Sequence, residues 1–248
     1  ERPAKARLLH GIGAMPIHPA HATLEPALST ATSTWLEGLD FDWGELVAGR
    51  RLRALRKNEC LFAQGQTDAN VYIVHSGRVR LTIHDHEGSE LHVAIVGRTG
   101  LLGDTGASAF GIHLCSAYAS AQSSVYVLPR QALLEGITRH PAWLRQSRAM
   151  ADHLMRLSLQ HHWLLGVQGA RQRVCHHLLG LLASHGQPHP RGRLIGIGFS
   201  QQEMAELCCI SRVSVSHVWR ELEREGVIER EGRLLLVRDQ TALARKAR

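Results

Sequence analysis

The residues best suited to specific chemistry lie near the carboxyl end of the chain, between Phe199 and Ile228. Ser200 and Glu203 have the S-x-x-E spacing of a capping box, in which a hydroxyl and a carboxylate each bind a backbone amide at the start of a helix. This spacing predicts a helix that begins at Gln201. Serine, glutamine and basic side chains at such a position suit contacts with phosphates.

A second helix is predicted after a short turn at Cys209 and Ile210, with Ser211 as its cap. Its apolar residues have the i, i+3, i+4, i+7 spacing of a helix that buries one face, and they are Val215, Val218, Trp219 and Leu222. The opposite face carries small and basic groups that suit DNA base edges and phosphates. With those at the two helix starts, the candidate DNA-contacting residues are Ser200, Gln201, Ser211, Arg212, Val213, Ser214, Ser216, His217 and Arg220.

A short hairpin is predicted to follow, since Glu225-Gly226-Val227-Ile228 is succeeded by GRLLLVRD. Two capped helices, a small Ala205 where they would cross and a terminal hairpin together predict a winged helix-turn-helix. An ordinary helical bundle explains the helices but not the hairpin. No G-x-S-x-G or P-loop motif is present in the sequence, so we expect no enzyme. A cupin-like metal enzyme is the remote alternative. The two clustered histidine and glutamate motifs of such enzymes are missing.

Composition and charge agree with a DNA-binding protein. The 248 residues are 44% hydrophobic and carry a net charge of +7, of which +5 falls on residues 171–248, where an anionic partner such as double-stranded DNA would be attracted. No apolar run is long enough for a membrane span, and we expect a cytoplasmic protein. Five cysteines without a CxxC pair predict neither a disulfide framework nor a metal site.

The elements that position this motif change character along the chain. Residues 1–30 have no sustained period and are interpreted as an N-terminal arm. Residues 31–138 contain short β-rich runs, among them VYIVHSGRVRLTI, LHVAIVG and SSVYVLP, separated by turn-forming residues, which predicts a β-roll or jelly-roll sensor domain.

A long helix is predicted over 139–168. An apolar stripe with 4,3 spacing runs along it, typical of a coiled-coil seam, and its members are Trp143, Met150, Leu154, Leu157, His161 and Leu164, with Ser147 between the first two. We interpret the helix as a homodimer seam; the alternative is packing on the chain's own core. Gly166 and Gly169 would form a hinge into residues 169–248, where a second helix ends at Gly186 and QPHPRGR is expected to be a loop. The fold class is therefore α+β.

The whole pattern resembles the cyclic AMP receptor/FNR superfamily of bacterial transcription regulators. Its sensor signature, G-x-x-A-x-x-x-Y-x-[IL]-x-x-G, is similar to Gly65, Ala69, Tyr72, Ile73 and Gly77. GLLGD is similar to a family turn, and CSAYASA is similar to the segment that receives a cyclic nucleotide's phosphate. The resemblance implies a cyclic-nucleotide-binding-like sensor, a dimerisation helix, a homodimer on an inverted-repeat operator, and RNA polymerase as a further partner.

The chain departs from the family at the effector. Where cyclic-nucleotide members have an arginine that pairs with the phosphate, this chain has Cys115, so a buried phosphate would stay uncompensated and cyclic AMP is not expected. We expect a small organic effector instead. Its candidate pocket residues are Gly103, Asp104, Leu114, Cys115, Ser116, Ala117, Tyr118, Met155, Ser158 and Leu159.

The cofactor is left unassigned. Residues 1–59 contain no cysteine, so the iron–sulfur cluster of the oxygen-sensing branch is not expected. A haem-based gas or redox sensor on the same scaffold is the alternative, with His84, His86, His92, His113 and Cys115 as candidate ligands. Solvated turn histidines and a buried structural cysteine are the favoured interpretation of these residues. In the recognition helix, Val213 replaces the family's glutamate and would favour a thymine methyl over cytosine.

Overall fold

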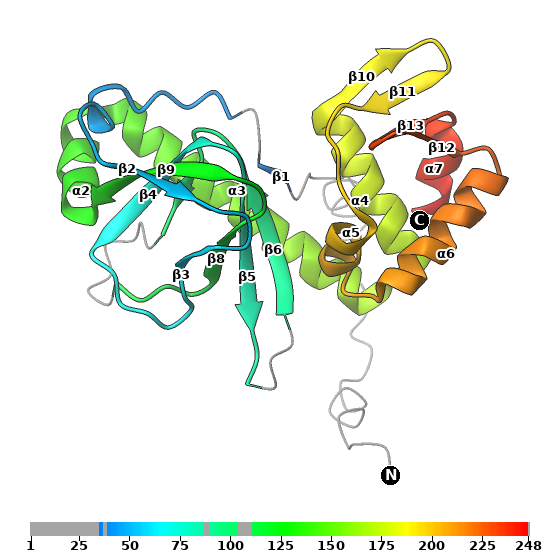
Figure 1. The fold of residues 1–248 in the computed structure, drawn as a ribbon, viewed down its shortest axis with the longest axis horizontal. Helices are drawn as coiled ribbons and strands as arrows, with labels where there is room; N and C mark the ends of the chain where they lie inside the picture. Colours follow the sequence, from blue (N-terminus) through cyan, green and yellow to red (C-terminus); the bar gives the residue numbers. More distant parts are fainter. Residues whose placement is uncertain (1–34, 37–38, 87–89, 104–110, 248) are drawn as a thin grey trace, which may run out of the picture. The chain divides into compact units, whose positions relative to one another are not determined.

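The computed structural model describes residues 35–36, 39–86, 90–103 and 111–247. The expected arm at residues 1–30 and the candidate pocket residue Asp104 lie outside these ranges. The fold is the expected one: a β-rich sensor domain, a long helix and a winged helix-turn-helix domain (Figure 1).

The sensor domain is built from two β-sheets around one apolar core. One sheet has the order β1-β6-β5-β8-β3 and the other the order β2-β9-β4-β7. Their bounds are β1 Trp35–Leu36, β2 Leu52–Leu55, β3 Cys60–Phe62, β4 Asn70–Ser76, β5 Val79–His84, β6 Glu90–Val96, β7 Leu101–Leu102, β8 Ser116–Ala119 and β9 Ser123–Pro129, with a 3-10 turn, η2, at Gly44–Leu46. The three runs read as β-rich thus become β4, β5, β6 and β9.

Gly77 shows why the β4–β5 turn needs its glycine. Its φ is +76°, in the region that L-residues rarely adopt, and a Cβ there would overlap the Ser123 hydroxyl and the Gln122 carbonyl. Ser123 in turn accepts the backbone N–H of Arg78 at 3.0 Å, so the turn is tied to the start of β9.

Three helices follow the sheets. α2 (Arg130–Arg139), which the sequence analysis did not foresee, packs on β9, and α3 (Pro141–Val167) occupies nearly the whole of the expected 139–168. Pro141 stands in the first turn of α3, where its missing N–H has no helical partner to lose. The chain is extended at Gln168 and Gly169 before α4 (Ala170–His185) begins, so the break falls at the expected hinge while Gly166 stays helical.

The DNA-binding domain surrounds a second apolar core with α4, α5 (Gln201–Cys208), α6 (Arg212–Arg224) and α7 (Gln240–Lys246). A sheet of order β10-β11-β13-β12 completes it, formed by β10 (Gly186–His189), β11 (Gly192–Ile195), β12 (Ile228–Glu231) and β13 (Leu234–Val237) (Figure 1). The expected loop QPHPRGR is therefore part of a hairpin. Pro188 is tolerated because β10 is an edge strand, where a missing backbone donor breaks no interior ladder.

Candidate DNA interface and effector site

The first helix of the motif begins where the capping box predicts. The backbone N–H of Glu203 donates to Ser200 Oγ at 3.1 Å, and the backbone N–H of Ser200 donates to Glu203 Oε2 at 2.7 Å. α5 starts at Gln201, and its inward residues Met204, Leu207 and Cys208 are buried. The reciprocal cap fixes the start of α5 and leaves Ser200 exposed.

The turn between the two helices depends on Cys209. Its φ and ψ are both 50°, the left-handed conformation that ends many helices, and a side chain there costs about 1 kcal/mol relative to glycine. The backbone N–H of Ile210 donates to the Ala205 carbonyl at 3.0 Å, which satisfies one of the last helical carbonyls. The turn therefore sends the chain directly into α6.

The second helix is held by one cap and one apolar face. The backbone N–H of Ser214 donates to Ser211 Oγ at 3.0 Å, and the predicted apolar residues of α6 are all buried: Val215, Val218, Trp219 and Leu222. Buried Ala205 lies on α5, which packs directly against α6. The helix is thus fixed in position by its inward face, and its other face is left to contact a partner.

The outward face of α6 carries the predicted DNA-contacting side chains. Arg212, Val213, His217 and Arg220 are exposed, Val213 to 68%, while Ser214 and Ser216 are half-buried. Within the described residues Arg212 makes no hydrogen bond or ion pair, so its guanidinium is available for a guanine edge. Arg220 instead donates from Nε to the Ser216 carbonyl at 3.3 Å, one turn earlier on its own helix.

The wing adds two basic residues that the sequence analysis did not single out. The Arg230 guanidinium lies 5.1 Å from the centre of the Trp219 ring, and it forms an ion pair with Glu223, with Nε 2.9 Å from Oε1. Arg233 follows on the other side of Gly232, which takes φ +62° in the hairpin turn. In the sequence, Arg230 and Arg233 lie on either side of Gly232, and basic residues around a turn glycine could have indicated a DNA-contacting wing.

The candidate effector residues are dispersed between core and surface. Leu114 is 85% exposed, Met155 61% and Leu159 56%, whereas Ser116 and Ala117 are buried in β8. Gly103 takes φ +101° after β7, and Tyr118 lies under the Arg80 guanidinium at 5.0 Å. Their shared role in one pocket remains a prediction.

Cys115 and Ser116 occupy the segment that resembles a phosphate site. Cys115 packs partly buried against the sensor core, and burial raises the pKa of its thiol to about 11, which keeps it neutral. The buried Ser116 Oγ accepts the backbone N–H of Gln64 at 2.9 Å. The segment thus presents a neutral thiol and an occupied hydroxyl where a phosphate would need a cation.

A small hollow of 140 Å³ lies between the β5–β6 hairpin and α3. Ser158 of the candidate set lines it, together with Ile83, Leu91, Val93, His161 and Leu165. Organic ligands usually occupy pockets of about 300–1,000 Å³, so this hollow alone is too small for most of them.

The candidate haem or metal histidines have separate partners. His92 is buried, with Nε2 at 3.2 Å from Glu206 Oε2 and 3.3 Å from Glu90 Oε1, and His113 stacks on Phe62 with ring centres 3.8 Å apart. His84 Nε2 is 3.0 Å from Thr82 Oγ1. Among the residues that the structure describes, no group of three or more histidine, cysteine or acidic side chains is arranged to hold a metal ion.

The apolar stripe on α3 faces the chain's own interior, as the alternative interpretation had it. Trp143, Met150 and Leu157 belong to the sensor core, Leu154 packs against it, and His161 and Leu164 are also buried. The exposed apolar side chains of α3 are instead Leu144, Met155, Leu159 and Leu165. This second face is the one that a partner helix could cover.

No helix in the described part of the chain is both long and apolar enough to span a membrane.

Family models match two parts of the sequence: a cyclic nucleotide-binding domain over residues 52–140 and a Crp-like helix-turn-helix domain over residues 172–246. The chain is 32% identical over 168 residues to the cyclic AMP receptor protein of Thermus thermophilus, covering 68% of this chain and 74% of that one. It is 27% identical over 228 residues to a CRP-like cAMP-activated global transcriptional regulator of Mycobacterium tuberculosis, covering 91% and 94%.

Solved structures share the fold. A CooA variant from Carboxydothermus hydrogenoformans aligns with a TM-score of 0.72 at 21% identity, covering 84% of this chain and 92% of that one. FixK2 from Bradyrhizobium japonicum aligns with a TM-score of 0.68 at 21% identity, covering 79% and 96%. The capped reading helices, the sensor sheets and the sequence matches agree: this chain belongs to the Crp-Fnr family of DNA-binding transcription regulators, which are not enzymes.

Proposed function

We propose that this regulator acts as a homodimer on an inverted-repeat operator, under the control of a small organic effector other than cyclic AMP, and that it works together with RNA polymerase. The observation that carries the DNA-reading part is the outward face of α6, on a helix fixed by its buried side. Val213 is 68% exposed there, and the Arg212 guanidinium has no ion pair or hydrogen bond among the residues that the structure describes. Two-fold dimers of such helices read half-sites about 34–36 Å apart.

The dimer surface that we propose is the exposed face of α3 rather than its buried stripe. Met155 and Leu159 are one helical turn apart and both more than half exposed, and Leu144 extends the same helix toward its start. Apolar residues of this size on a solvent-facing helix are the usual mark of a protein contact. A partner helix would also close the small hollow that Leu165 lines.

The effector part of the proposal is supported by Cys115. A phosphate buried beside a neutral thiol would lose its hydration without gaining a compensating charge, which strongly opposes binding. The curated relatives in Thermus thermophilus and Mycobacterium tuberculosis are named for cyclic AMP, so this chain would differ from them in the ligand and not in the fold.

A selection of DNA sequences bound by the full chain, followed by footprinting, tests the reading mode. We expect a palindromic site with a protected half-site on each side, and an asymmetric site occupied by one protomer would contradict the proposal.

Calorimetric titration with cyclic AMP tests the effector separately. We expect no tight binding, whereas tight binding that is lost in Ser116→Ala would refute the assignment. A Soret band in the absorption spectrum of the purified protein would show bound haem and would likewise refute the organic effector.

A further inference from the structure

A thiol and an imidazole from different elements meet beside the reading helices. Cys209 lies in the turn that follows α5, His161 lies near the end of α3, and Cys209 Sγ is 3.5 Å from His161 Nε2. The two residues are 48 positions apart in the chain, so no motif of fixed spacing predicts that they meet. Neither belongs to the candidate DNA-contacting residues, and the proposed function leaves the pair unused.

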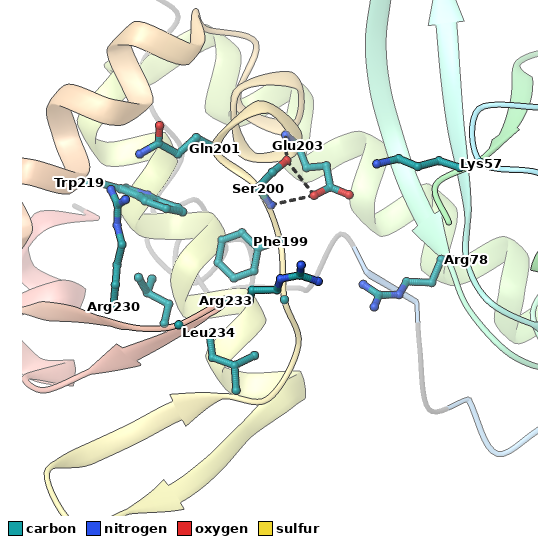
Figure 2. Close-up of a pocket in the computed structure, with 13 residues that line it drawn as sticks. Lys57, Arg78, Phe199, Ser200, Gln201, Glu203, Trp219, Arg230, Arg233 and Leu234 are labelled. Carbon is teal, nitrogen blue, oxygen red and sulfur yellow. Dashed lines mark hydrogen bonds between the residues drawn. The ribbon is translucent and has the colours of Figure 1, made fainter. Parts of the chain in front are cut away.

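The Cys209 thiol is held in place by the turn around it. α5 begins at the reciprocal cap of Ser200 and Glu203, which Figure 2 shows, and it ends at Cys209 in the left-handed conformation. Glycine adopts that conformation without steric cost, so a cysteine at this position calls for an explanation beyond the turn itself. Cys209 is exposed, and an ion can therefore reach it from solvent.

His161 supplies the second donor from a buried position. It is only 8% exposed, and the Cys209 thiol is the one hydrogen-bonding contact of its side chain among the residues that the structure describes. A thiol is a weak hydrogen-bond partner, whereas most buried polar groups have a strong one. Burial and the charge of Arg173 lower the pKa of His161, so the imidazole is neutral and can give a lone pair to a metal ion.

The distance between the two donors fits a shared metal ion. Bonds from a d¹⁰ ion to thiolate sulfur and to imidazole nitrogen are about 2.3 Å and 2.0 Å, so two such donors on one ion lie about 3.5–4.3 Å apart, depending on the angle. The observed 3.5 Å is at the short end of this range. Thiolate and imidazole together are ligands that copper and zinc prefer over Mg²⁺ or Ca²⁺.

The charge beside the pair favours a monovalent ion. Burial raises the pKa of the Cys209 thiol, and the nearby Arg173 guanidinium opposes that shift. This guanidinium makes no ion pair or hydrogen bond within the described part of the chain, so its charge is not neutralised there. A monovalent ion that replaces the thiol proton leaves the net charge of the pair unchanged, whereas a divalent ion adds a positive charge close to Arg173.

We propose that Cys209 Sγ and His161 Nε2 bind one soft monovalent metal ion, Cu(I) or its analogue Ag(I). The ion takes the place of the thiol proton, which passes to solvent, and it accepts the lone pair of the neutral imidazole. Cu(I) is stable with two ligands, so the pair needs no third protein donor. The bound ion would join α3 to the turn between the two reading helices. The site requires neither an operator nor the organic effector, so it stands or falls separately from the proposed function.

A competition titration of the reduced full chain with Cu(I), under anaerobic conditions and without DNA, tests the proposal. Bathocuproine disulfonate serves as the competing chelator. We expect one Cu(I) ion per chain, with both a sulfur and a nitrogen neighbour in copper X-ray absorption, and Zn(II) bound about tenfold or more weakly. Loss of all Cu(I) to the chelator, or Zn(II) bound as tightly as Cu(I), would overturn the proposal.

Variants locate the site. Cys209→Ser changes an exposed side chain and should weaken Cu(I) binding about tenfold or more, and His161→Gln should do the same. Cys60→Ser removes another exposed thiol, whose Sγ faces the Phe62 carbonyl, and His162→Gln removes the exposed imidazole next to His161; neither should change the affinity. Unchanged binding in Cys209→Ser, or equal losses in the two controls, contradicts the site even if His161→Gln does not fold.

Arg173→Gln tests the charge argument. The substitution removes the positive charge beside the pair but neither donor, so Zn(II) binding should become stronger while Cu(I) binding stays nearly the same. The same competition titration measures both ions. An unchanged ratio of the two affinities would refute the preference for a monovalent ion.

Discussion

Arg212 and Arg220 stand on the same exposed face of α6 but in different chemical situations. Arg212 lies in the first turn, with no hydrogen bond or ion pair among the described residues, whereas Arg220 lies two turns further and already donates to the Ser216 carbonyl. A free guanidinium can form two parallel bonds to guanine O6 and N7, and a partly engaged one is better suited to a single phosphate contact. The two arginines should therefore contribute to different properties of the complex.

Truncation of each arginine separates these properties. Arg212→Ala should weaken binding to the selected operator by about 1–3 kcal/mol and relax the preference at one base position of each half-site, because a base contact is lost. Arg220→Ala should weaken all sequences alike and reduce the slope of affinity against salt by about one unit. Fluorescence anisotropy with the operator and single-base variants, at several salt concentrations, measures both effects. An unchanged base preference in Arg212→Ala would rule out direct reading by this residue.

At the scale of elements, the sequence predicted best where a local rule decides the structure. Ser200 and Glu203 fix a helix start through their own hydrogen bonds, and Ser211 does the same for α6, so no distant residue is needed. The hairpin that contains Pro188 escaped prediction because the strand that joins it to a sheet, β13, lies far along the chain from β11. Likewise the 4,3 stripe on α3 identified a buried face correctly, but periodicity does not say whether a partner helix or the chain's own sheet covers it.

Substitutions of two leucines on α3 distinguish a stripe covered by a partner helix from one covered by the chain's own sheet. Leu157 lies in the sensor core, and Leu157→Ala should lower the free energy of unfolding by about 2–5 kcal/mol because it leaves a cavity. Leu159 is 56% exposed, and Leu159→Ala should instead shift the protein from dimer toward monomer in sedimentation equilibrium. Urea unfolding and sedimentation of both variants make the comparison with the same chemical change. Dissociation caused by Leu157→Ala alone, in a folded protein, would restore the buried stripe as the seam.

For the whole molecule, buried imidazoles gather where α3, α4 and α5 pack near β6. His161 and His177 have ring centres 6.1 Å apart, His176 contacts Gln160, and His92 contacts Glu206. Burial lowers the pKa of His176 to about 4, and burial with neighbouring imidazoles and Arg173 lowers that of His177 to about 3. Burial also lowers the pKa of His161, and the nearby Arg173 charge adds to that shift. Burial lowers the pKa of His92 as well; there the Glu206 and Glu90 carboxylates oppose the shift, and Arg80 adds to it.

These neutral histidines predict a protein that is destabilised by mild acid. Since their folded pKa values lie below the unfolded value near 6.5, the unfolded chain binds more protons, and stability is complete above about pH 6.5 and falls as pH drops toward the folded values. Each buried histidine adds a slope of up to about 1.4 kcal/mol per pH unit. Urea unfolding between pH 8 and 5 should show this loss, and His177→Gln should flatten it, whereas exposed His162→Gln should not. Parallel curves for the parent protein and His177→Gln would show that protonation of this imidazole does not govern acid stability.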